Sequence, residues 1–141
     1  MEKVHWLESM SIGVPEIDQQ HRQLLELVNK TWETAQGRDA AAETDATLRE
    51  LCDYVINHFA AEEALMDPET YAGYDRHIQE HIDCSMRAMD FLETFSEGKS
   101  VRLEEFLDFA AAWVRHHIQE TDQTLGEFLR HKRPQPDEQP G

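Results

Sequence analysis

Four long segments of this 141-residue chain place apolar residues every three or four positions, and Gly, Pro and capping residues separate the segments. That period is typical of amphipathic helices, and no segment sustains the alternation typical of a β-strand. The expected helices cover residues 18–36, 39–66, 71–95 and 100–130, with Asp18 and Ser100 as N-caps. Because the links between them are short, neighbouring helices should be antiparallel. The sequence therefore predicts an all-α protein, an up-down-up-down four-helix bundle preceded by an irregular N-terminal arm.

The length and composition indicate one domain. With 40% hydrophobic residues, a chain of this length is able to bury one core without disulfides. We expect the bundle to occupy residues 1–131. Residues 132–141, KRPQPDEQPG, include three prolines and almost nothing to bury, so we expect them to form a disordered tail.

Charge and hydropathy limit the partners of the chain. Asp and Glu number 29 against 13 Lys and Arg, so the net charge of −16 repels nucleic acid and anionic lipid. No apolar run reaches the roughly 20 residues of a membrane span, and the first residues, MEKVHWLESM, lack the apolar centre of a signal peptide. We therefore expect a cytoplasmic protein with no nucleic acid or membrane partner, and the sequence does not identify a protein partner.

Only two cysteines are present, too few for a disulfide framework or a thiolate zinc site. We expect Cys52 and Cys84 to be reduced thiols in or near the core, because free cysteines are usually buried.

Histidines and carboxylates stand in the inner stripes of the predicted helices, where Leu or Ile would have no desolvation cost. Two pairs of them are spaced four residues apart, so that each pair lies on one face of its helix, and the first and last helices add one imidazole each. These inner polar residues are His21, His58, Glu62, His77, His81 and His117. Four helices that direct imidazoles into one volume predict a metal site.

The donor types separate this site from the ferritin-like diiron sites, which use two Glu-x-x-His motifs. The one Glu-x-x-His here runs from Glu2 to His5, in the arm. A site rich in imidazole suits iron, copper, zinc or nickel. Helical spacing would add Glu120 to the site, four residues after His116 and three after His117.

Four segments of the chain resemble the hemerythrin family, in the family's order and spacing. The match covers nearly the whole chain and is closest to the single-domain bacterial members. The segments are IDQQHRQL at 17–24, HFAAEEALM at 58–66, HIQEH at 77–81 and WVRHHIQETD at 113–122.

The resemblance implies a site with two iron ions and an oxo or hydroxo bridge. It assigns His77, His81 and His117 to one iron, His21 and His58 to the other, and Glu62 and Asp122 to both. Asp122 is five residues after His117, about 140° around an ideal helix, so we expect it to reach inward from the helix edge or through a π-bulge.

Five imidazoles, two bridging carboxylates and the bridge supply eleven of the twelve bonds of two six-coordinate ions. The vacant position implied by the resemblance belongs to the iron held by His21 and His58, where molecular oxygen binds reversibly as hydroperoxide. We therefore expect an oxygen carrier, store or supplier, not an enzyme. Two alternatives stay open: an oxygen or redox sensor, and a diiron enzyme acting on peroxide or nitric oxide.

The resemblance also implies an apolar oxygen pocket lined by Leu24, Val114 and Ile118, and these three residues are equally compatible with a structural core. Trp113 is one turn before His117 and should lie near the metals. The family often has larger side chains at Val114 and Cys84, so the size of the pocket is expected to differ.

Overall fold

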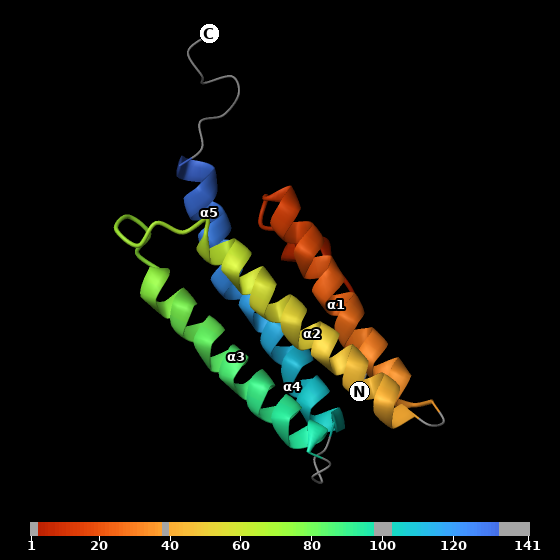
Figure 1. The fold of residues 1–141 in the computed structure, drawn as a ribbon. Helices are drawn as coiled ribbons and strands as arrows, with labels where there is room; N and C mark the ends of the chain where they lie inside the picture. The colour runs from red at the N-terminus through yellow and green to blue at the C-terminus, as the bar shows by residue number, and fades with distance from the viewer. Residues whose placement is uncertain (1–2, 38–39, 98–102, 133–141) are drawn as a thin grey trace.

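The computed structural model describes residues 3–37, 40–97 and 103–132 (Figure 1). Its helices, in chain order, are the 3-10 turn η1 (Glu8–Met10), α1 (Pro15–Ala35), α2 (Ala40–Glu63), α3 (Tyr74–Ser96), α4 (Leu103–His116), the π-helix η2 (His117–Thr121) and α5 (Asp122–Lys132). The last three follow one another without a break and form a single helical run. These described residues contain no strand, and the predicted all-α bundle with an N-terminal arm is confirmed.

The helices pack as the short links predict. Helix α1 packs against α2 and α4, and α2 packs against α3. Figure 1 shows the start of α1, the end of α2, the start of α3 and helix α5 gathered at one end of the bundle, so neighbouring helices are antiparallel. Among the described helices, none is both long enough and apolar enough to cross a membrane.

The first helix begins earlier than predicted. It starts at Pro15, whose fixed φ suits the first helical position, and Val14 is the N-cap. Asp18 does not cap the helix. Its carboxylate binds the N-terminal arm instead, because it accepts hydrogen bonds from the Ser11 hydroxyl, at 2.5 Å, and from the Ile12 backbone N–H, at 2.8 Å. The prediction for Asp18 was therefore wrong.

The second helix ends earlier than predicted, and the third helix begins later than predicted. Helix α2 ends at Glu63, three residues before Met66, and α3 begins at Tyr74 instead of Tyr71. Residues between them form turns, such as the one closed by the Tyr71 N–H on the Asp67 carbonyl. The proposed N-cap at Ser100 and most of the predicted tail lie outside the described residues.

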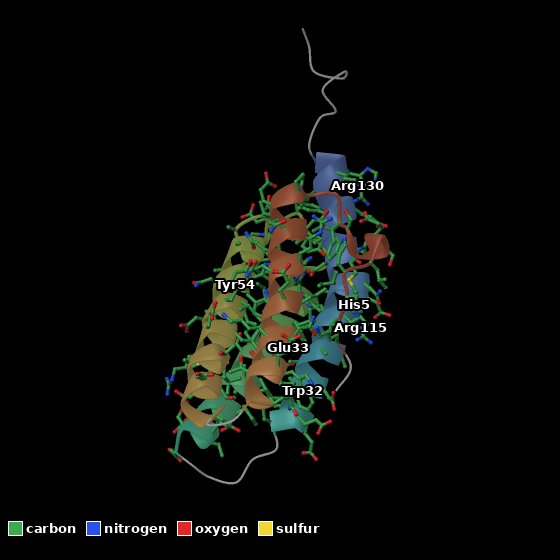
Figure 2. All side chains as sticks on the ribbon, turned by 90° about the vertical axis from the view of Figure 1, so that its right-hand side faces the viewer. His5, Trp32, Glu33, Tyr54, Arg115 and Arg130 are labelled. Atoms are coloured by element: carbon green, nitrogen blue, oxygen red, sulfur yellow. The ribbon has the colours of Figure 1, made fainter. Side chains whose placement is uncertain are left out.

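The N-terminal arm runs back along α1. The backbone of Val4 forms two hydrogen bonds with the Asn29 side chain, whereas Ser11 meets Asp18, near the start of the helix. Figure 2 shows the arm on the face formed by α1 and the α4–α5 run. Gly13 adopts a φ of 80°, a conformation that favours glycine, where the chain turns into α1.

Two apolar clusters form the core. The larger cluster fills the body of the bundle and includes Leu24, Phe59, Cys84 and Val114. The smaller cluster lies at the end of the bundle where α5 is found, and comprises Ile12, Val14, Ile17, Met66, Tyr71, Leu125 and Leu129. Along each helical run, the buried histidines and carboxylates lie near the point where residues of one cluster give way to residues of the other. The core is therefore divided by one polar layer.

Candidate metal centre

The polar layer is made of seven buried side chains from all four helical runs. Their relative exposures range from 0% to 3%, so water has almost no access to them. They are His21 from α1, His58 and Glu62 from α2, His77 and His81 from α3, His117 from η2 and Asp122 from the start of α5. The structure thus brings together all seven residues that the sequence and the family resemblance selected.

The imidazoles form two groups around the carboxylates. We call His77, His81 and His117 the three-histidine group, and His21 and His58 the two-histidine group. Donor atoms of the first group lie within 4.8 Å of one another together with oxygens of Glu62 and Asp122, and those of the second group lie equally close together with Glu62.

Glu62 divides its two oxygens between these groups. Its Oε2 lies 2.9 Å from the Nε2 atoms of both members of the two-histidine group. Its Oε1 lies 3.1, 3.0 and 3.6 Å from the Nε2 atoms of His77, His81 and His117.

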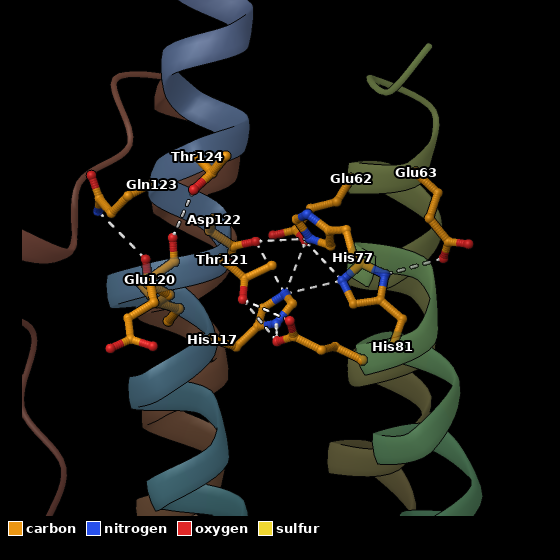
Figure 3. Close-up of polar contacts among 12 residues, drawn as sticks. Glu62, Glu63, His77, His81, His117, Glu120, Thr121, Asp122, Gln123 and Thr124 are labelled. Carbon is orange, nitrogen blue, oxygen red and sulfur yellow. Dashed lines mark hydrogen bonds and ion pairs between the residues drawn. The ribbon is translucent and has the colours of Figure 1, made fainter. Parts of the chain in front are cut away.

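Asp122 repeats this division from the opposite side of the layer (Figure 3). Its Oδ1 lies 3.1 Å from the Nε2 atoms of both His77 and His117. Its Oδ2 lies 3.0 Å from Nε2 of His21. Each carboxylate therefore connects the three-histidine group with the two-histidine group.

Asp122 reaches the layer because the helix contains a π segment. Its backbone N–H donates to the carbonyl of His117, five residues earlier, so one extra residue is accommodated and the side chain turns inward. This confirms the expected π-bulge. The residue favoured by simple spacing, Glu120, lies at the surface and pairs with His116, whose Nδ1 is 3.1 Å away.

The outer ring nitrogens of three histidines have acceptor partners, which the sequence alone did not reveal. His58 Nδ1 donates to Gln20 Oε1 at 2.7 Å, His81 Nδ1 to Glu63 at 3.4 Å, and His117 Nδ1 to Glu80 at 3.1 Å. Each partner directly adjoins a selected residue in the sequence, yet each serves a histidine of a different helix. Their position next to a selected residue was the signal available in the sequence, but that position does not indicate which histidine each of them contacts.

Glu80 has further contacts. Thr121 donates its hydroxyl to both Glu80 oxygens, at 2.8 and 2.9 Å, and the guanidinium of Arg76 lies 3.3 Å away. The His117 hydrogen bond, with help from these neighbours, lowers the pKa of Glu80 to about 2. The carboxylate is thus charged at neutral pH and orients the imidazole of His117.

The hydrogen bonds of the Nδ1 atoms determine whether the inward-facing Nε2 atoms carry a lone pair. A neutral imidazole that donates through Nδ1 has a lone pair on Nε2. His81 and His117 both donate outward, and their Nε2 atoms face each other at 3.1 Å. Two lone pairs so close repel each other unless a proton or a metal ion lies between them.

The carboxylates lead to the same conclusion. The two oxygens of Asp122 are fully buried, and their close partners are the imidazole nitrogens of His21, His77 and His117, at 3.0 to 3.1 Å. Adjacent donor atoms on one six-coordinate ion, with bonds of about 2.1 Å, lie roughly 3 Å apart, which matches the separations in the layer. The donor set therefore fits metal ions.

The pKa shifts show how strongly the layer attracts positive charge. Burial opposes charging of His21, but hydrogen bonds and charge from Asp122 and Glu62 outweigh it and raise its pKa to about 9. Burial likewise opposes charging of His117, and the same two carboxylates raise its pKa well above 6.5. For His81, burial prevails and lowers the pKa. Burial alone would raise the pKa values of Glu62 and Asp122, yet the imidazoles hold both well below the usual range.

Aromatic rings cover the layer on the side of the larger cluster. Trp113 stacks on His117, with ring centroids 4.5 Å apart and planes 12° apart. Phe59 stacks on His81 at 3.9 Å and 7°. These rings restrict the imidazole orientations and exclude water.

The residues expected to line an oxygen pocket all belong to the larger apolar cluster or pack against it. Leu24 and Val114 also line a small apolar cavity of about 20 Å³, together with Cys52 and Cys84. Ile118 and Trp113 are not part of that lining. Both cysteines are free and buried, as expected, and burial raises their pKa values to about 11 and 12.

Comparisons with known proteins agree with this geometry. The family model described as the hemerythrin HHE cation binding domain matches residues 12–129. The chain is 29% identical over 126 residues to a bacteriohemerythrin of Pseudomonas aeruginosa, covering 89% of this chain and 81% of that protein. It is 30% identical over 125 residues to a bacteriohemerythrin of Stenotrophomonas maltophilia, covering 89% and 80%.

A solved structure has the same fold. The crystal structure of a wild-type hemerythrin superposes with a TM-score of 0.84 at 28% identity, covering 91% of this chain and 98% of that one. The family match extends over most of the sequence and includes all seven side chains of the polar layer. The chain therefore belongs to the hemerythrin family.

Proposed function

We propose that the polar layer holds two iron ions and that the protein binds molecular oxygen reversibly, as a carrier, store or supplier. The seven side chains would be the protein ligands. The observation that carries the proposal is the division of both carboxylates between the three-histidine and two-histidine groups. A single ion would not require two donor groups that share two carboxylates.

The donor atoms predict where oxygen binds. On the side of the three-histidine group, three nitrogens join Glu62 Oε1 and Asp122 Oδ1, giving five donors. On the side of the two-histidine group, two nitrogens join Glu62 Oε2 and Asp122 Oδ2, giving four. A shared oxo or hydroxo bridge would raise these numbers to six and five. The vacant position would therefore be on the ion held by His21 and His58.

Iron ions bound there would supply the two electrons that oxygen takes up and later returns. The donor set alone is also suitable for copper, zinc or nickel, and the affinity order favours copper. The choice of iron rests on the family to which the chain belongs.

The surrounding residues suit binding without turnover. Leu24, Val114 and Ile118 are buried, with exposures of 2%, 4% and 1%, and would limit access of water and protons to bound oxygen. These three residues and Trp113 carry no carboxyl, hydroxyl or imidazole group to serve as a proton donor. We accordingly propose a binding protein and not an enzyme, with residues 1–131 as the functional bundle and the cytoplasm as its location.

The test is metal content together with visible absorption. The reduced protein, prepared without oxygen, is exposed to air and then returned to an oxygen-free atmosphere. We expect two irons per chain and a visible band that forms in air and disappears when oxygen is removed. An irreversible change would contradict a carrier and favour a sensor, and steady consumption of peroxide or nitric oxide would favour an enzyme. One iron per chain, or none, would contradict the diiron site.

A further inference from the structure

Gln123 follows Asp122 directly but points away from the imidazoles, toward the N-terminal arm (Figure 3). Its side-chain amide lies within hydrogen-bond distance of three backbone carbonyls. Two belong to the arm, Ser9 at 3.2 Å and Ser11 at 3.1 Å. The third belongs to Ile118, inside the π-helix η2, at 3.4 Å. One side chain thus connects the arm to the segment that aims Asp122.

The arm is itself held from two other sides. Asp18 of α1 accepts the hydrogen bonds from Ser11 and Ile12 described above. The guanidinium of Arg130, in α5, donates to the Ile12 carbonyl at 2.8 Å. The arm is therefore fixed both to α1 and to α5, the helix that carries Gln123.

The packing of the arm on α5 leaves no room for adjustment. A Cβ atom at Gly126 would lie 2.5 Å from the Ile12 carbonyl oxygen and 2.9 Å from its Cβ. Only glycine permits this approach, so the position of the arm is determined by contact as well as by hydrogen bonds.

The π segment needs such support. A π-helix is rare because its geometry is less favourable than that of an α-helix, and it persists where surrounding contacts require it. If residues 117–121 relaxed to α-helical geometry, Asp122 would rotate away from the histidines, since successive residues of an α-helix are about 100° apart. A contact that stabilises η2 therefore stabilises the inward orientation of Asp122.

We propose that residues 9–12 of the arm, acting through Gln123, hold the π-helix in the geometry that directs Asp122 into the metal centre. Gln123 is a positioning residue and does not touch the donor atoms. The expected effect of Gln123 on metal retention rests on the proposed diiron site. The expected effect of Gln123 on η2 does not, because it exists in the metal-free protein as well.

The experiment uses two variants that disturb the connection differently. Gln123→Met keeps the length of the side chain and removes its donors, and Gly126→Ala pushes the arm from α5. The matched control is Gln79→Met on α3, where an exposed glutamine donates a hydrogen bond to Asp83. Hydrogen exchange of the metal-free proteins is measured on peptides covering residues 117–123, with α2 peptides as a reference, together with the melting temperature.

We expect both arm variants to exchange at 117–123 about ten times faster than the parent, while α2 peptides and the Gln79→Met protein are unchanged. Unchanged exchange at 117–123 would overturn the inference, as would an equal rise in every helix accompanied by a lower melting temperature, which indicates general destabilisation.

Iron retention supplies the second measurement. In the loaded protein, both arm variants should lose iron to an excess of chelator about ten times faster than the parent and Gln79→Met, by analogy with other supports of metal ligands. Loss at the parent rate would contradict the positioning role. A parent protein that binds no iron would instead remove the proposed function, while the exchange measurement would still decide the role of the arm.

Discussion

Glu62 and Asp122 face each other across the polar layer, and each directs one oxygen to the three-histidine group and the other to the two-histidine group. They come from different local structures. Glu62 lies in the last turn of α2, four residues after His58, whereas Asp122 depends on the π-helix. The two carboxylates are therefore equivalent in geometry but differ in how the sequence encodes them.

Replacing Asp122 tests whether this residue, and not Glu120, is a ligand of the metal centre. Asp122→Asn removes a negative charge and one of two acceptor oxygens, so we expect metal content to fall from two ions to at most one per chain. Glu120→Gln is the matched control, because Glu120 is exposed, pairs with His116 at the surface and should leave metal content unchanged when it is replaced. Elemental analysis of both proteins checks this, and the reverse pattern would show that spacing, not the π-helix, selects the ligand.

His77→Leu should lower stability both with and without metal, for different reasons. In the loaded protein it removes a donor, so metal affinity should fall by at least tenfold and the melting temperature should drop. In the metal-free protein it removes a fully buried imidazole that lies 3.1 Å from both Glu62 and Asp122, so two buried carboxylates lose a partner and the free energy of unfolding should fall by about 3–5 kcal/mol. Thermal and urea unfolding of both forms measure this, with the exposed His116→Leu as a control. A metal-free variant as stable as the parent would contradict the pairing of His77 with the carboxylates.

Glu80→Gln tests the outer support of His117. The amide keeps an acceptor but loses the charge that the imidazole now faces, so metal release should become about 10–100 times faster. Glu63→Gln is a graded comparison, because its contact with His81 is longer, at 3.4 Å, and the expected effect is smaller. Release rates are measured with a chelator at neutral pH. No change in either variant would mean that these carboxylates do not tune their histidines, and equal effects would contradict the grading by distance.

The loaded and metal-free proteins should respond oppositely to pH between about 6.5 and 9. In the metal-free protein the pKa of His21 is raised to about 9, so its stabilising contribution is complete below 6.5 and is lost as pH rises through 9. The raised pKa of His117 acts in the same direction. Metal binding requires deprotonated imidazoles, so protons compete with metal over the same range and the loaded protein should instead weaken as pH falls through it. Melting curves at several pH values check both slopes, and parallel curves would refute the assignment.

Most of the bundle and six of the seven converging residues are predictable from the sequence, because spacing of four on a helix determines which side chains share a face. Asp122 is not, because a π segment changes the angle between residues and leaves no periodic signal. It was found through the family resemblance. The roles of Gln20, Glu63 and Glu80 depend on the relative heights of neighbouring helices, which one sequence does not contain. The N-cap assignment of Asp18 failed because the arm uses its oxygens and Pro15 already begins the helix.

The polar layer also determines where the length of the chain is free to change. Inserting one residue into a helix rotates everything beyond it by about 100°, which would turn a converging side chain out of the layer. The ends of α1 and α3, at Ala35 and Ser96, and the starts of α2 and α4, at Ala40 and Leu103, lie at the opposite end of the bundle (Figure 1). Residues added between these helix ends alter neither helix. Insertions, deletions and fused domains should therefore be accepted at that end and rejected at the end where the arm, α5 and the polar layer meet.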